Sequence, residues 1–363
     1  MNRTPIQLQI ASPFFENTRW SHQVLQDTWQ PIINWLGAGT ARIFPPPIQD
    51  AGTLGKLGAV ILAVRRFQNI QGFADLGIEL GSDPDSGSWS TMYLALQLSK
   101  TDDCEVIEFE PSSEGNRKAD IAANLLGVRH LFECKSADHN DSGRTRRHEI
   151  IDLLKPYIPD GVQIDVCFEA DLSNDEWKSL AESIADRAPN ASQEGAIIKN
   201  AKLEVIAQPG QDCVPERFHE CRLEGFLETT SSGEVLLVSS YTAQNTRLSV
   251  AGPKLDPRPF VQKAFNASRH QRTADAPFVL VVDVTMLGVG LQATADAART
   301  FFQPKRNTSY AGVLAVRRSA AAEGMRLESQ LVGNPFARSP LATELTRHWP
   351  NVHVPARFDS PLE

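Results

Sequence analysis

The 363-residue sequence has no long hydrophobic run. Its longest apolar segments are residues 57–64, which end at Arg65-Arg66, and residues 278–290, which contain Asp283. Neither approaches the roughly 20 residues that a membrane-spanning helix needs. The N-terminal residues 1–6 also lack the apolar region of an export signal. These absences predict a soluble cytoplasmic protein with no membrane span.

Cysteine is scarce, and its spacing indicates no structural or catalytic framework. The five cysteines are Cys104, Cys134, Cys167, Cys213 and Cys221. No C-x-x-C pair occurs, so the pattern indicates neither a zinc knuckle nor a thioredoxin-type redox site. His219 between Cys213 and Cys221 lacks the paired ligand spacing of a zinc site. We therefore expect reduced thiols, the ordinary state in the cytosol.

Other well-known catalytic motifs are missing too. No G-x-x-x-x-G-K-[ST] occurs, which argues against ATP-driven translocation by this chain. No G-x-S-x-G elbow occurs, so serine hydrolase chemistry has no support. Gly37-Ala-Gly39 follows a helical stretch rather than a strand, which argues against a dinucleotide-binding turn. The net charge of −8 argues against non-specific coating of nucleic acid but leaves room for a local basic groove.

The chain divides at a segment rich in Gly, Ser, Asp and Pro at 81–88. Residues 1–85 have the apolar spacing of amphipathic helices. Beyond the linker, the pattern predicts a helix at 89–99, strands at 105–110, 118–123 and 129–136, a helix at 148–157 and a strand at 162–168. We therefore expect an α/β protein with a core over 86–170. Residues 171–363 have a mixed α and β pattern and are expected to pack on that core.

Three charged residues within this predicted core carry the chemistry. Glu133 and Lys135 are two apart on one strand and share a face, while Cys134 points into the core. A tight hairpin brings the strand of Asp120 alongside, so its carboxylate lies next to that of Glu133. Two carboxylates beside an ammonium suit a hard divalent cation such as Mg²⁺. The plainer alternative is a salt-bridged sheet face that contributes little.

These residues resemble a known family. Ala119-Asp120, a gap of twelve residues and then Glu133-x-Lys135 are similar to the PD-(D/E)XK signature of restriction-endonuclease-like nucleases, and the predicted element order is similar to that family's αβββαβ core. The resemblance implies an Mg²⁺- or Mn²⁺-dependent endonuclease-like hydrolase acting on nucleic acid, with DNA favoured, in defence or repair. It assigns Asp120, Glu133 and the Cys134 carbonyl as metal ligands and Lys135 as the catalytic lysine.

One departure from the family keeps a second function open. Many members carry a glutamate on the first core helix, but residues 89–100 contain no acid. Glu79 is the nearest substitute and is a further candidate ligand. The alternative is a catalytically silent nuclease-fold module that binds nucleic acid or a partner protein. A homodimer and an unidentified partner both remain open.

A nuclease also needs cationic surface for phosphates. Basic residues gather at 143–148, 244–272 and 302–318. From these runs the candidate nucleic-acid-binding residues are Arg144, Arg146, Arg147, Lys263 and Arg269. Asp283 interrupts an apolar strand, and such an acid usually has a buried partner. It is therefore either a structural acid or an extra site residue.

Overall fold

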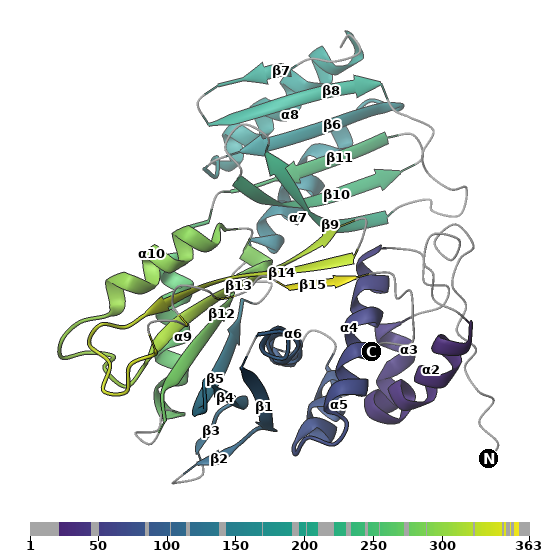
Figure 1. Cartoon of the computed structure of the whole chain (residues 1–363). Helices are drawn as coiled ribbons and strands as arrows, with labels where there is room; N and C mark the ends of the chain where they lie inside the picture. Colours follow the sequence, from purple (N-terminus) through teal and green to yellow (C-terminus); the bar gives the residue numbers. More distant parts are fainter. Residues whose placement is uncertain are drawn as a thin grey trace. The chain divides into compact units, whose positions relative to one another are not determined.

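The computed structural model describes residues 22–44, 51–83, 87–101, 103–113, 117–137, 143–168, 170–190, 196–200, 202–209, 221–229, 234–243, 246–253, 255–271, 276–287, 289–321, 324–342, 345, 349 and 352–355. The fold is mixed α/β (Figure 1). The chain forms two compact units. The core unit comprises Met1–Ser136, Val261–Asp283 and Thr294–Glu363, and the inserted unit comprises Ala137–Phe260 and Val284–Ala293.

The described part of residues 1–85 is helical, as predicted. Its elements are α2 (His22–Leu36), η1 (Gly37–Gly39), α3 (Thr40–Ile43), α4 (Ala51–Phe67) and α5 (Phe73–Ser82). Aromatic contacts bind these helices together, because Trp35 stacks on Phe73 with ring centroids 4.5 Å apart. The next helix, α6 (Ser88–Leu98), is buried along its whole length. A helix buried on every face needs no amphipathic pattern, which explains its run of apolar and small residues.

A seven-stranded sheet forms the centre of the core unit. Its order is β1 (Cys104–Phe109), β4 (Ile121–Leu125), β5 (Val128–Ser136), β12 (Phe278–Asp283), β13 (Gly312–Ala321), β14 (Gly324–Gly333) and β15 (Val352–Pro355). The first three strands form an antiparallel meander, in which the β4–β5 pair is the predicted hairpin. β12 runs parallel to both β5 and β13. A separate two-stranded ribbon joins β2 (Ser112–Ser113) to β3 (Arg117–Lys118).

The strand that follows the meander in the sheet is not the predicted one. We expected the helix at 148–157 and the strand at 162–168 to complete the core, but β12 pairs with β5 instead. The helix that precedes β12 is α9 (Pro257–Ala267), followed by η4 (Ser268–His270). Every residue of β12 is buried, which suits a central parallel strand covered on both faces. On one face it contacts the cluster that holds α6, and on the other Phe278 packs on Tyr310 and Tyr310 on Phe265 of α9.

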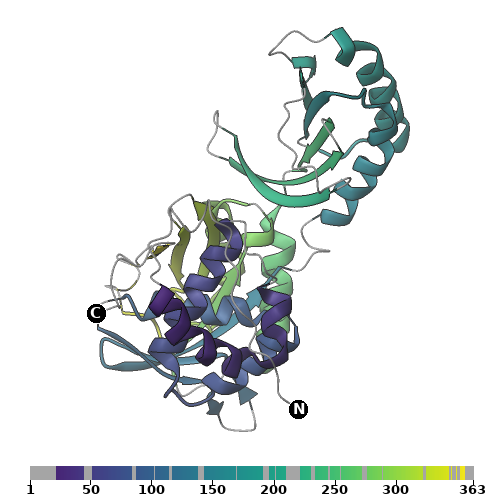
Figure 2. The same ribbon diagram turned by 90° about the vertical axis from the view of Figure 1, so that its right-hand side faces the viewer.

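The predicted strand at 162–168 belongs to the inserted unit. The sheet there has the order β7 (Ala196–Lys199), β8 (Leu203–Pro209), β6 (Val162–Phe168), β11 (Thr246–Ala251), β10 (Glu234–Ala243) and β9 (Cys221–Thr229). Its helices, α7 (Arg144–Leu154) with η2 (Lys155–Tyr157) and α8 (Asn174–Arg187) with η3 (Ala188–Asn190), cover one face (Figure 2). β6 alternates buried and half-buried residues, as a strand covered on one side does.

The inserted unit has its own core. Phe168 packs edge-on against Trp177 with centroids 5.2 Å apart. A capping box at Ser173 and Glu176 begins α8. The remaining elements are η5 (Thr285–Leu287) and α10 (Leu291–Phe301). The units therefore cut across the three expected regions, 1–85, 86–170 and 171–363, because 137–260 interrupt the core between β5 and α9.

Charge is divided unevenly between the units. Within residues 137–260, Asp and Glu exceed Lys and Arg by as much as the net charge of the whole chain, −8. The core unit is consequently neutral as a whole. A polyanion would be repelled by the inserted unit at long range. Among the described residues, no helix combines the length and apolar character required to cross a bilayer.

Candidate functional site

Asp120 is held at the start of β4 by backbone hydrogen bonds on both sides. Its N–H donates to the carbonyl of Phe132 on β5, and its carbonyl accepts from the N–H of Glu110, both at 2.9 Å. The side chain then accepts a hydrogen bond from the Cys134 N–H, 2.5 Å from Oδ2. The hairpin therefore places the Asp120 carboxylate beside β5, as predicted.

Glu133 and Lys135 project from the same face of β5. Glu133 Oε1 lies 2.5 Å from Lys135 Nζ. The contact is an ion pair rather than a well-aligned hydrogen bond, since neither oxygen of Glu133 has a hydrogen-bond partner of ordinary geometry among the described residues. The Glu133 side chain is 0% exposed, whereas that of Lys135 is 26% exposed. Cys134 points the other way, into the cluster around α6, as expected.

A pocket of about 210 Å³ lies where these elements meet. Its polar lining comes from Glu79, Ser88, Thr91, Glu110, Asp120 and Lys135. Glu79, the substitute acid suggested by the sequence, therefore shares a pocket with Asp120 and Lys135. It stands on α5, while α6 contributes hydroxyl groups. Glu133 does not line the pocket but lies behind Lys135, with which it is paired.

Burial controls the protonation of the two central acids. Desolvation raises the pKa of Asp120 to about 6, against the opposing effects of the Cys134 N–H and the Lys135 ammonium. The pKa of Glu133 is raised to about 8, first by burial and then by the charge of Asp120. Burial lowers the pKa of Lys135, but the neighbouring acidic groups, Glu133 first, together outweigh it and the net shift is upward. The site therefore favours added positive charge, whether from a proton or from a cation.

The donor set suits a hard cation, although the carboxylates are not yet gathered around one point. Glu79, Glu110 and Asp120 offer oxygen ligands of the kind that Mg²⁺ prefers. In the described part of the chain, no three Asp, Glu, His or Cys side chains already form a metal-binding group. A bound cation would have to draw these carboxylates together. The N–H and C=O of one strand residue face the same edge, so the Cys134 carbonyl lies on the edge facing Asp120.

Sequence reasoning missed Glu110. This residue directly follows β1 and has a left-handed backbone with φ 47°. Its N–H bonds to the Asp120 carbonyl, which fixes it beside that residue. The signal was present, because an antiparallel pair places the end of β1 next to the start of β4. Glu110 also raises the pKa of Asp120 by charge repulsion, after the larger effect of burial.

The candidate nucleic-acid-binding residues fall in both units. Arg144, Arg146 and Arg147 belong to the inserted unit, whereas Lys263 and Arg269 are exposed residues of the core unit. Arg146 already contacts the carboxylates of Asp171, at 2.7 Å, and Glu149, at 3.1 Å.

The assignment of Arg147 to nucleic-acid binding is corrected by its burial. Arg147 is 1% exposed. Its Nε donates to Ser239 Oγ at 2.8 Å, and another nitrogen donates to the Gly252 carbonyl at 3.4 Å. A phosphate cannot reach this guanidinium, which instead ties α7 to β10 and to the end of β11.

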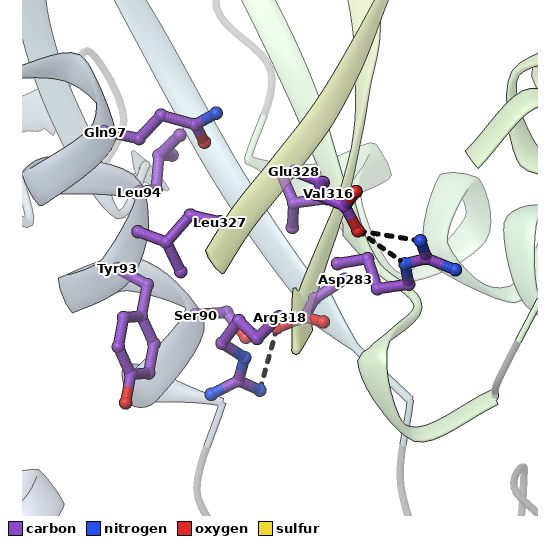
Figure 3. Close-up of a pocket in the computed structure, with 10 residues that line it drawn as sticks. Ser90, Tyr93, Leu94, Gln97, Asp283, Val316, Arg318, Leu327 and Glu328 are labelled. Carbon is purple, nitrogen blue, oxygen red and sulfur yellow. Dashed lines mark hydrogen bonds and ion pairs between the residues drawn. The ribbon is translucent and has the colours of Figure 1, made fainter. Parts of the chain in front are cut away.

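Asp283 has the buried partners expected of a structural acid. Its Oδ2 lies 3.0 Å from the Arg318 guanidinium and accepts a hydrogen bond from Ser90 Oγ at 2.5 Å (Figure 3). Arg318 also lies 4.8 Å from the ring centroid of Tyr93. The cavity at this network measures about 10 Å³. Space for about one water molecule excludes a substrate, so Asp283 positions α6 on the sheet.

Comparison with known proteins adds no relative. No protein-family profile, no curated protein and no solved structure matches this chain. The site must therefore be interpreted from its own residues.

Proposed function

We propose that this chain is a metal-dependent nuclease that hydrolyses phosphodiester bonds in nucleic acid, with DNA as the favoured substrate. The observation that carries the proposal is the convergence of Glu79, Glu110, Asp120 and Lys135 on one pocket, with Glu133 directly behind Lys135. The order α6, β1, β4, β5, α9 and β12 supports it, because this order is similar to the αβββαβ core of restriction-endonuclease-like nucleases once the inserted unit is set aside.

In this proposal the acidic residues bind the metal ion and the lysine stabilises charge on the phosphate. Asp120, with Glu79, Glu110 and the Cys134 carbonyl, would hold Mg²⁺ or Mn²⁺, and Glu133 would join them by shifting from Lys135. A bound divalent cation activates water and neutralises charge on the phosphate. Lys135 lines the pocket, where its ammonium stabilises the negative charge that builds up on phosphate oxygens during attack. Water adds to phosphorus, the ester P–O bond breaks, and the leaving oxygen takes up a proton.

The rival function is a non-cleaving binding module, and one observation favours it. Glu133 is fully buried, paired with Lys135 and absent from the pocket lining. If this pair does not open, Glu133 cannot reach the pocket and the site loses a ligand. The chain would then bind nucleic acid or a partner protein without cutting it.

Metal-dependent stabilisation and cleavage separate the two functions. Plasmid, linear and single-stranded DNA are incubated with the protein at varied Mg²⁺ and Mn²⁺, and melting temperatures are measured with each metal. We expect cleavage with a divalent cation and a higher melting temperature, because a cation that binds only the folded state stabilises it. Asp120→Asn should abolish both effects without unfolding the protein. Asp152→Asn, at an exposed pair with Lys155, is the control. Metal stabilisation without cleavage of any substrate would favour the binding module.

A further inference from the structure

The N-terminus of α6 opens into the same pocket as the carboxylates. Gly87, Ser88 and Thr91 line the pocket, and the N-cap residue, Gly87, supplies no side-chain acceptor for the first N–H groups of the helix. By contrast, α8 is closed by the Ser173–Glu176 capping box. The open N–H groups of a helix start carry partial positive charge and bind anions.

Ser88 provides a second and independent sign of a ligand. Its side chain is buried, at 6% exposed, yet it lines the pocket. Among the other hydroxyls of the first turn, that of Ser90 is engaged, since it donates to Asp283. The Ser88 hydroxyl has no hydrogen-bond partner among the described residues. Its oxygen is not among the fully enclosed unpartnered atoms of these residues, so it is open to the pocket, where a ligand can accept its proton.

From these two observations we infer that the start of α6, with the Ser88 hydroxyl, binds a non-bridging oxygen of the substrate phosphate. This inference rests on the proposed function and specifies which part of the substrate enters the pocket. A phosphate at a helix N-terminus is a general solution for binding that group. The start of α6 lies next to the end of β5, because a Cβ on Gly87 would be 3.1 Å from Ser136 Oγ.

The carboxylates on the other side of the pocket allow a phosphate to bind only together with a cation. Glu79, Glu110 and Asp120 repel an isolated anion, so the phosphate enters together with its cation. The pocket volume of about 210 Å³ holds a phosphate group and a cation but is smaller than the roughly 300 Å³ of the smallest drug-sized ligand pockets. We therefore assign the backbone phosphate, rather than a nucleobase, to this pocket.

Calorimetric titration of two probes tests the inference on the full chain at saturating Mg²⁺. The probes are inorganic phosphate and the dinucleotide TpT, whose internal phosphodiester represents the substrate. Ser88→Ala should weaken binding of both probes about five-fold, the scale of one lost hydrogen bond. Ser88→Asp should abolish phosphate binding, because its carboxylate occupies the anion site while favouring the helix start. Ser183→Ala, at a serine on α8 that bonds Ser179, is the control.

The outcomes separate this inference from the proposed function. Mg²⁺ affinity should be unchanged in Ser88→Ala, because the serine contributes to the anion side. If Ser88→Asp does not fold, the affinities of Ser88→Ala for the two probes test the inference on their own. Wild-type affinity for TpT in the variants overturns the inference, as does weakening confined to inorganic phosphate. If no DNA is cleaved but both probes bind and Ser88→Ala weakens both, the proposed function fails while the phosphate site stands.

Discussion

Lys135 has two roles, one in the ion pair with Glu133 and one in the pocket. The ammonium lies against the fully buried Glu133 side chain and also reaches the pocket that holds Asp120. Once Glu133 is ionised, above its pKa of about 8, loss of this partner leaves a buried charge with a large desolvation cost. Substitution of Lys135 should therefore affect stability as well as catalysis, and the two effects need separate measurements.

Lys135→Ala should cut cleavage by roughly 10²-fold or more, the usual scale for loss of one stabiliser of the transition state. Mg²⁺ and DNA binding should remain nearly intact, because an ammonium does not ligate a cation. Lys135→Arg should not restore cleavage, since a planar guanidinium differs in shape from a compact ammonium. Single-turnover cleavage rates measure the effect. Lys199→Ala, which removes an exposed pair with Glu204, is the control. Equal rates for wild type and Lys135→Ala would contradict the catalytic role.

Glu133 should make the metal-free protein less stable as the pH rises. The folded protein holds this proton up to a pKa of about 8, whereas the ordinary value is 4.5. Between these values the unfolded chain loses the proton first, so unfolding becomes easier with rising pH. Glu133→Gln should remove the part of this slope above about pH 6, because Asp120, whose pKa is raised to about 6, adds a slope of the same sign below that value. Melting temperatures of both proteins from pH 4.5 to 8 in chelator provide the measurement, and parallel curves would show that Glu133 does not carry this proton.

At the scale of single elements, Arg147 shows how a basic run can serve a fold rather than a ligand. It follows Arg144 and Arg146 on α7, and of these three arginines only Arg147 is buried. Its guanidinium satisfies acceptors on Ser239 and Gly252. Sequence spacing could not distinguish it from Arg146, because both belong to the same charged run.

Arg147→Ala should lower the free energy of unfolding by about 2 kcal/mol or more, because buried acceptors lose their donor. Arg146→Ala should cost less than about 1 kcal/mol, since its ion pairs lie at the surface. Urea unfolding of each variant measures the change in its free energy of unfolding. DNA affinity should not change in Arg147→Ala once folding is confirmed. A stable Arg147→Ala variant that binds DNA more weakly would contradict the structural role.

Elements formed by neighbouring residues were predictable, and their long-range partners were not. The meander around Asp120 and Glu133 follows from local alternation and a short turn, so the central residues of the site could be found from sequence. The partner of β5 could not, because nothing local connects it to β12 across residues 137–277. The fully buried run of β12 was the available signal for a central parallel strand. Glu110 was missed for a related reason, because its place depends on the pairing of β1 with β4.

The whole molecule should unfold in two steps. Each unit has its own hydrophobic cluster, one around α6 and β5 and the other around α7, α8 and β6. Scanning calorimetry should resolve two transitions. Mg²⁺ should raise only the transition of the core unit, which holds the candidate site, and Arg147→Ala should lower only the other. One transition that responds to both changes would mean that the units unfold together.

The place of the inserted unit also determines the order in which the chain can fold during synthesis. β5 leaves the ribosome well before β12, and at about 5–20 residues per second the delay is roughly 7 to 30 s. The inserted unit is almost complete within that interval and can fold first. Until then the inner edge of β5 has no strand to pair with, and an unpaired edge invites association with other chains. A nascent chain stalled before residue 278 should therefore depend on chaperones, although one of its units is almost complete.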